Sequence, residues 1–416
     1  MKIIHTADWH IGNVFHQHER TAEHAHFLAW LLAMVRSERP DALLVVGDVF
    51  DNAQPAPKAE KLLWEFLDRL TQENPQLRII ITSGNHDSAA RLEAQAALYR
   101  RIGVQVRGIL PREEGGRVLL DDLYIPIEGK DADDQAVIVA APYLRRGDVG
   151  GNSLEEGAAQ LMKDLLKGAS KKWKGVPVVL MAHVFVEGVL RELCEDRKIP
   201  VIKGLVGVDM QEVALDAAYV ALGHIHKPMA AEHLENVRYC GSAVPLSFGE
   251  KAYKHGVNVV EISPDGGAAV RFEEYQPLCP LLSIPQQGAA RFEEVLDELK
   301  RFPLCEKGSS ADGCPYVEIM VAEKTAEPAQ LRALQAEADR RQVRLCRIVR
   351  VNADGTRPAY ADSVEEEELC APLNVAKLAR EAYKRCFRED MPDETAQLFA
   401  EVKRECEQGP SEAAAK

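Results

Sequence analysis

Residues 3–10 read IIHTADWH, a short hydrophobic run that ends in polar side chains. Four further runs have the same form, namely ALLVVGD (42–48), RIIITSGNHD (78–87), VPVVLMAH (176–183) and YVALGHIH (219–226). Buried parallel strands read as continuous Val, Ile and Leu runs, and open α/β sheets place their chemistry just past the carboxyl ends of the strands. The runs therefore predict an α/β fold in which the polar ends of five strands meet at one edge.

The side chains at these five ends are of types that bind divalent metal ions. They are Asp8, His10, Asp48, Asn85, His183, His224 and His226. Seven ligands suit two ions better than one, because a tetrahedral zinc ion needs only three or four. Asp48 is the natural bridge between two ions, since it lies in sequence between the other donors. Two ions about 3.5–4 Å apart can stabilise both the attacking and the leaving oxygen of a phosphoryl displacement.

Each of these residues has a simpler explanation when it is taken alone. Asp8 and Asn85 belong to types that commonly cap helices or form turns, and a lone His183 would usually be a core histidine. His224 and His226 are harder to explain in this way, because alternate residues of an extended segment point to the same side. The metal interpretation therefore depends on the recurrence of donors at five strand ends.

Several strings resemble the signature of the calcineurin-like metallophosphoesterases. They are DWH (8–10), GDVFD (47–51), GNHD (84–87), His183 and GHIH (223–226). Longer stretches narrow the resemblance to the SbcD-type exonuclease subunits of bacteria, namely HTADWHIG (5–12), VVGDVFDNAQP (45–55), APYLRRGD (141–148) and RYCGSAVPLSFGE (238–250). The resemblance is good over roughly the first two-thirds of the chain and extends to the remainder only in layout. It implies a metallophosphoesterase core of β-sheet layers flanked by helices.

The resemblance also implies a role for each site residue. One ion would be held by Asp8, His10, Asp48 and His226, and the other by Asp48, Asn85, His183 and His224. His86 would be a non-ligand histidine beside the scissile phosphate that assists the leaving oxygen, and Asp87 would orient it. Without the motif, His86 would be an exposed turn histidine. His5 and Asp51 could fix imidazole orientations, or could be packing and turn residues.

The family usually works with manganese, and the donor set agrees with that metal. Carboxylate, amide oxygen and imidazole donors without a thiolate suit Mn, Fe or Zn rather than copper. We therefore expect two divalent ions, with Mn²⁺ as the first choice.

The chain divides into five predicted segments. Residues 1–276 form the metallophosphoesterase domain, and alternating strand and helix patterns predict a small α/β capping domain at 277–352. A polar linker at 353–371 leads to two amphipathic helices at 372–408, and residues 409–416 form a disordered tail. The resemblance implies that the helical pair binds the coiled-coil base of an SMC-like ATPase of the SbcC type, and packing against the chain's own body is the alternative.

Composition indicates a soluble protein of two or three domains, since 416 residues are 46% hydrophobic and 28% charged. No apolar run approaches the length of about 18 residues that suggests a membrane span, and MKIIHTAD leads into a strand rather than a signal peptide. The nine cysteines occur singly without a C-x-x-C pair. We therefore expect a cytoplasmic protein with reduced thiols and no membrane contact.

The net charge of −14 argues against a nucleic-acid substrate, because DNA attracts basic surfaces. Local charge matters more than the total, however, and two bound cations or a partner subunit could supply a positive field. Candidate DNA contacts are Arg145, Arg146 and the lysines of KGASKKWKG (167–175), although a charge run is more often a solvated face. The helical patterns at 58–70 and 88–102 either cover the sheet or, by the resemblance, form a homodimer within a heterotetramer.

These observations together predict a metal-dependent DNA exonuclease, with hairpin or single-strand endonuclease activity, that acts on DNA ends in repair and recombination. It would be the catalytic subunit of a complex with the ATPase. A small-molecule phosphodiesterase or phosphatase would share all seven ligands but would need neither the cap nor the helical pair. A non-catalytic DNA-end scaffold would be expected to lose ligands. A purely structural metal site would not need seven ligands.

Overall fold

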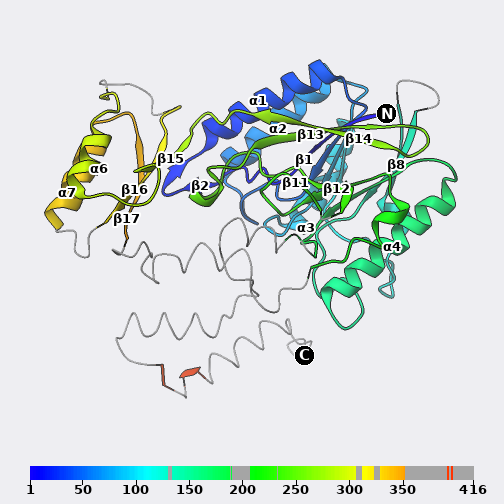
Figure 1. The fold of residues 1–416 in the computed structure, drawn as a ribbon. Coiled ribbons are helices and arrows are strands. Elements are labelled where there is room, and N and C mark those ends of the chain that lie inside the picture. Colours follow the sequence, from blue (N-terminus) through cyan, green and yellow to red (C-terminus); the bar gives the residue numbers. More distant parts are fainter. Residues whose placement is uncertain are drawn as a thin grey trace, which may run out of the picture. The chain divides into compact units, whose positions relative to one another are not determined.

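The computed structural model describes residues 1–129, 134–187, 189, 207–231, 233–305, 312–322, 328–351, 391–392 and 395–396 (Figure 1). Apart from the last four of these residues, the predicted linker, helical pair and tail lie outside the described residues. The described residues between 1 and 351 belong to one compact unit.

A first sheet contains six strands, in the spatial order β14 (Ala268–Tyr275), β13 (His255–Ile262), β1 (Lys2–Thr6), β4 (Ala42–Val46), β5 (Arg78–Thr82) and β6 (Val104–Arg107). Strands β1, β4, β5 and β6 are mutually parallel, and β13 pairs antiparallel with both β1 and β14. One face packs against α1 (Thr21–Glu38), α2 (Pro57–Glu73) and α3 (Ala89–Arg101), as Figure 1 shows for α1 and α2. The stripe of Leu63, Phe66, Leu67 and Leu70 on α2 is buried in this core, which confirms that it covers the sheet.

A second sheet also contains six strands, in the order β11 (Met229–Ala231), β12 (Leu234–Tyr239), β10 (Tyr219–Gly223), β9 (Val178–His183), β8 (Gln135–Ala140) and β7 (Tyr124–Glu128). Strands β8, β9, β10 and β12 are parallel, and the two edge strands are antiparallel to their neighbours. Helix α4 (Leu154–Lys172) packs on the outer face. Ser153 caps this helix by accepting the backbone N–H of Glu156, and Glu155 and Glu156 suit the positive end of the helix dipole.

The two sheets stack face to face around an apolar layer. This layer takes side chains from both sheets, such as Leu44 and Ile80 of the first and Val179 and Met181 of the second. The five predicted strands exist, but they are divided between two sheets, with β1, β4 and β5 in one and β9 and β10 in the other. The site therefore lies where two sheets end side by side rather than at one edge of a single sheet. The family fold of sheet layers flanked by helices is confirmed.

A small α/β unit follows, which we define as residues 281–350. It consists of β15 (Leu281–Ile284), α6 (Phe292–Leu299), β16 (Tyr316–Val321), α7 (Pro328–Ala338) and β17 (Arg344–Arg350). The three strands are parallel in the order β15-β16-β17 and share an apolar core with both helices. The alternation predicted from the sequence is confirmed, and the domain boundaries at 276 and 352 remain predictions.

Among the described residues, the structure contains no helix with the length and apolar character needed to cross a lipid bilayer.

Candidate metal centre

The loops that leave β1, β4 and β10 hold four of the predicted ligands in an unusual backbone conformation. Asp8, His10, Asp48 and His224 have positive φ angles of 50°, 47°, 47° and 100°. L-residues rarely adopt this region, and each such residue costs on the order of 1–3 kcal/mol unless its surroundings enforce it. The backbone N–H of Asp8 donates to the carbonyl of Gly47, and that of His10 donates to the carbonyl of Asp48. These bonds fix the first two loops against each other.

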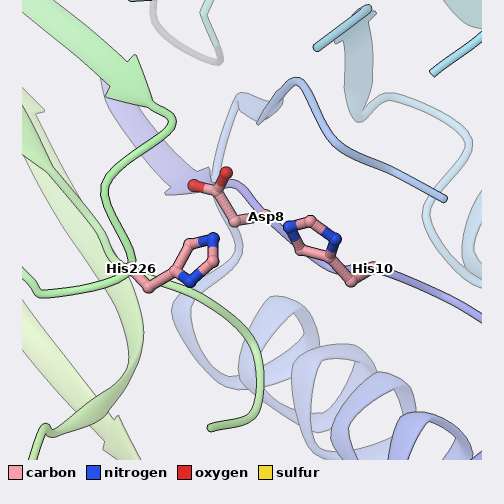
Figure 2. A group of neighbouring side chains, drawn as sticks. All are labelled: Asp8, His10 and His226. Carbon is pink, nitrogen blue, oxygen red and sulfur yellow. The ribbon is translucent and has the colours of Figure 1, made fainter. Parts of the chain in front are cut away.

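The structure brings all seven predicted ligands into one cluster. Donor atoms of Asp8, His10 and His226 lie within 4.8 Å of one another, as do those of Asp8, Asp48 and His183. Figure 2 shows the first group, in which the loop after β1 meets the segment that follows β10. Asn85 joins the cluster through its Oδ1 atom, which lies 3.0 Å from His183 Nε2 and 3.0 Å from His224 Nδ1.

The surroundings of His183 fit a cation. Its Nδ1 atom lies 3.0 Å from the carbonyl oxygen of Val46, which can only accept, so Nδ1 carries a proton. Its Nε2 atom faces Asn85 Oδ1 at 3.0 Å and Asp48 Oδ2 at 3.3 Å. A neutral imidazole would set its lone pair against these two oxygens. A metal ion or a proton at this position removes the conflict.

His10 gives independent support for a metal. The residue is 2% exposed, and its Nε2 atom has no hydrogen-bond partner in the part of the chain that the structure describes. That atom lies 3.7 Å from Asp48 Oδ2, while Nδ1 lies 3.3 Å from Asp51 Oδ1. A buried polar nitrogen without a partner is costly, and metal coordination would satisfy it. Asp51 makes the contact expected of a residue that orients this ring.

Glu250 is a site residue that the sequence reasoning missed. It lies in the short 3-10 helix η3 (Phe248–Glu250), is 2% exposed, and places Oε1 3.1 Å from Nδ1 of His226. A carboxylate at this position accepts the Nδ1 proton and leaves Nε2 of His226 available to a metal. The only signal in the sequence was an acidic residue at the end of RYCGSAVPLSFGE.

The histidines of the cluster differ in the direction in which their pKa is shifted. Burial lowers the pKa of His226 and His183, but nearby carboxylates together outweigh it and raise each pKa to about 9, with Glu250 the main one for His226 and Asp48 for His183. Burial and repulsion from His183 lower the pKa of His224 to about 3. Without metal, two protons therefore occupy positions that cations can take. Metal binding would release these protons.

The two carboxylates of the cluster also differ. Burial raises the pKa of Asp8, although His183 and His226 oppose this effect. Burial acts in the same direction on Asp48, but attraction from His183 and His10 outweighs it, and the pKa of Asp48 falls well below its usual range. The carboxylate of Asp48 is therefore an anion. Histidine nitrogens of both groups of donors face it, which suits a ligand that bridges two ions.

His86 is exposed and lies at the rim of the cluster. Its backbone N–H donates to Asp48 Oδ1 at 2.8 Å, and its Nδ1 atom lies 2.8 Å from the carbonyl oxygen of Asp51. This carbonyl orients the ring and leaves Nε2 directed elsewhere. His86 also lies within 4.8 Å of His10 and Asp48, so the geometry admits a ligand role besides the predicted one.

Asp87 differs from the expectation that it orients His86. Its carboxylate is 2% exposed and accepts the backbone N–H groups of Val49, Phe50 and Gly84 at 3.1, 3.0 and 2.9 Å. These bonds tie the loop after β4 to the loop after β5. Asp87 therefore holds two ligand-bearing loops together, and Asp51 takes the orienting role that the sequence interpretation gave to Asp87.

The structure supports one of the two interpretations of His5, that of a packing residue. It is fully buried, with Nδ1 2.9 Å from the hydroxyl of Tyr219 and Nε2 3.2 Å from the carbonyl oxygen of Leu222. Both partners belong to β10 in the opposite sheet. His5 thus connects the two sheets as a packing residue.

The basic residues that were predicted to contact DNA lie in different parts of the structure. The guanidinium of Arg145 lies 5.8 Å over the ring of Tyr143, and that ring lies 6.0 Å edge-on from His183, so Arg145 is near the cluster. Arg146 instead donates to the carbonyls of Val149 and Gly151 in its own loop. Lys172 pairs with Asp121 and covers Trp173. Arg145 is the best placed of these cations to meet a substrate.

Comparison with known proteins defines the class of the chain. The model of the calcineurin-like phosphoesterase family matches residues 1–228, which is more than half of the sequence. The chain therefore belongs to the calcineurin-like phosphoesterases, a family of hydrolases, and the family and the donor cluster together indicate divalent metal ions.

Relatives place the chain more narrowly. The D subunit of the SbcCD nuclease of Rhodobacter capsulatus is 36% identical over 371 residues, which cover 87% of this chain and 90% of that protein. The corresponding subunit of Escherichia coli K12 is 30% identical over 63% of this chain and 65% of its own length. That of Bacillus subtilis is 30% identical over 64% and 67%. Within the phosphoesterases, the chain thus belongs with the D subunits of SbcCD nucleases.

Proposed function

We propose that this protein is a metal-dependent DNA nuclease that works in a complex with a coiled-coil ATPase. The observation that carries the proposal is the cluster of seven donors around Asp48, in which nitrogen and oxygen acceptors face one another and require a cation. The relatives are named as nuclease subunits, and the resemblance in sequence extends beyond the phosphoesterase region in the R. capsulatus protein.

Two ions that share Asp48 would account for all seven ligands. The first ion would be held by Asp8, His10, Asp48 and His226, and the second by Asp48, Asn85, His183 and His224. We call these positions the first and the second metal site. Asp8 also accepts the backbone N–H of His224 through both oxygens, at 3.0 and 3.1 Å, so the two sites share a backbone link. The oxygen and nitrogen donors suit Mn²⁺.

The chemistry follows from the residues around the donors. When bound, two divalent ions would supply an activated water nucleophile and would neutralise charge on the phosphate. His86 stands at the exposed rim with Nδ1 fixed on the carbonyl of Asp51, so its other nitrogen can hold a proton for the leaving oxygen. Arg145 and Tyr143 lie on the side of His183, and we expect the guanidinium of Arg145 to bind the DNA backbone.

The assembly and substrates are also proposed. The substrates are DNA ends and hairpins, cut by exonuclease and endonuclease action, and the ATPase is an SbcC-type subunit that binds residues 372–408. Two copies pair through α2 and α3 within a heterotetramer, and Leu98, a large hydrophobic side chain on α3 that is 57% exposed, supports this surface. We place the protein in the cytoplasm, because the five described cysteines are all free thiols.

The function is tested with purified protein freed of metal by a chelator. Linear and hairpin DNA should be degraded after Mn²⁺ is added and should stay intact with chelator. A parallel assay should use small phosphate mono- and diesters. Hydrolysis of these esters together with intact DNA under every divalent metal would replace the nuclease proposal with a small-molecule phosphoesterase.

A further inference from the structure

We propose that Glu250 is a positioning residue for the first metal site and that the small α/β unit holds it in place through η3. This inference rests on the proposed metal-dependent function. It assigns the small α/β unit a second task besides any contact with substrate, which is to shape one of the two metal sites.

The carboxylate of Glu250 has almost no freedom to turn. Oε1 faces Nδ1 of His226 at 3.1 Å and accepts the hydroxyl of Ser247 at 3.3 Å, while Oε2 accepts the backbone N–H of Leu246 at 2.8 Å. Both oxygens are therefore engaged in a buried environment, and they set the tautomer and the angle of the His226 ring. Residues that orient a ligating histidine in this way affect metal affinity almost as strongly as ligands do.

The helix η3 that carries Glu250 packs directly on the small α/β unit. Phe248 is 3% exposed and shares an apolar cluster with Leu281 and Tyr316. The guanidinium of Arg347, on β17, lies 5.3 Å over the Phe248 ring. The chain just before Glu250 is thus fixed by side chains of the small unit.

The residue that follows Glu250 is also attached to the small α/β unit, through a series of polar contacts. Lys251 donates to the hydroxyl of Ser283 on β15, and that hydroxyl donates to Glu318 Oε1 at 2.6 Å. Arg347 donates to the other oxygen of Glu318 at 3.0 Å. Glu318 is only 1% exposed, so this network is satisfied and rigid. Lys251, the residue next to Glu250, is therefore attached to the centre of the small sheet.

A second segment of the first site makes contact with the same unit. The hairpin of β2 (Val14–Phe15) and β3 (His18–Glu19) follows the loop of Asp8 and His10 closely, and the Phe15 ring lies 5.0 Å from the ring of Tyr316. The small unit therefore touches both the hairpin that follows Asp8 and His10 and the helix that carries Glu250.

The second site has no comparable attachment among the described contacts. His183 is held by Val46, Asn85 and the two aspartates, and His224 is held by Asn85 and Asp8, all of which lie in the phosphoesterase sheets and their loops. Loss of the small unit's hold on η3 should consequently weaken one metal site and spare the other.

The test measures metal binding without DNA. Metal-free wild-type protein, Glu250→Gln, Lys251→Met and the control Lys254→Met are titrated with Mn²⁺ by calorimetry, and bound metal is counted by elemental analysis. Lys254 is a matched control, because its Nζ atom pairs at the surface with Glu274. Thermal melting in chelator verifies that every variant is folded.

Glu250→Gln should weaken one of the two binding steps by about 10–100-fold and leave the other unchanged, since only one of the two terminal amide atoms can accept, whereas both carboxylate oxygens accept. Lys251→Met should weaken the same step to a smaller extent, and Lys254→Met should match the wild type. Two unchanged steps in Glu250→Gln, or equal weakening of both, would overturn the positioning role. A Lys251→Met protein that binds like the wild type would overturn the link to the small unit. A protein that gives the expected binding but leaves DNA intact would refute the proposed nuclease instead.

Discussion

Replacement of Gly84 by alanine should disable the metal centre while leaving the protein folded. Gly84 begins the GNHD turn, and its φ angle is not in the left-handed region, so alanine is tolerated by the backbone itself. A Cβ atom at this position would lie 2.0 Å from Asp48 Oδ1 and 2.3 Å from the backbone nitrogen of Asp48. Ordinary contacts begin at 3.4 Å, so the carboxylate oxygen must move by 1.4 Å and the backbone nitrogen of Asp48 by 1.1 Å.

A displacement of this size is large for a metal site, where ligand distances hold to within about 0.2 Å. Because Asp48 is the proposed bridge, both ions should be affected, and metal affinity should fall by at least about 100-fold together with nuclease activity. Overpacking costs about 1–3 kcal/mol, so the melting temperature in chelator should fall by only several degrees.

The assay is thermal melting with and without Mn²⁺, combined with calorimetric titration. The wild type should be stabilised by the metal and Gly84→Ala should not. Gly147→Ala is the control, because no atom lies within 4 Å of a Cβ built there. A Gly84→Ala protein that binds two Mn²⁺ ions with wild-type affinity would refute the bridging role of Asp48.

Three further predictions concern other parts of the protein. His224→Ala should lose an ion and activity. His86→Ala should keep two ions, while single-turnover DNA cleavage slows by roughly 10²–10⁴-fold. Loss of metal from the His86→Ala protein would show that His86 is a ligand. Burial lowers the pKa of His5 and His24 to about 3, so the unfolded chain takes up protons below about pH 6.5 while the folded chain does not. Denaturant titration in chelator should therefore show the free energy of unfolding falling by about 2 kcal/mol for each histidine between pH 7 and pH 5, and a constant value would contradict their neutrality. Removal of residues 372–408 should leave metal binding intact and weaken association with the ATPase, and unchanged co-purification would place that contact elsewhere.

The strands and the donors could be predicted from the sequence, because the signals are local. A buried parallel strand shows its Val and Ile run directly, and the residue type at its end shows its chemistry, as at Asp48 and His183. The division of five strands between two sheets could not be predicted, since it depends on pairings between strands far apart in the sequence. The antiparallel pairing of β13 with β1 is an example that leaves no local trace.

The surrounding contacts were harder to predict than the donors. Glu250 reaches His226 across 24 residues, and nothing in a single sequence distinguishes it from other acidic residues near turns. Asp87 was expected to orient its neighbour His86 because the two are adjacent in the motif. In the fold, its carboxylate instead satisfies backbone N–H groups of two loops that must meet. His5 lies close to Asp8 in sequence, yet it points between the sheets.

Two metal ions should act together in DNA hydrolysis, and a metal titration of the cleavage rate decides whether they do. Metal-free protein should be given Mn²⁺ in steps from zero to three equivalents, and the initial rate of DNA cleavage should be measured at each step. We expect little cleavage up to one bound equivalent and a rise to the full rate as the second ion binds. Full activity at one equivalent per chain would contradict it.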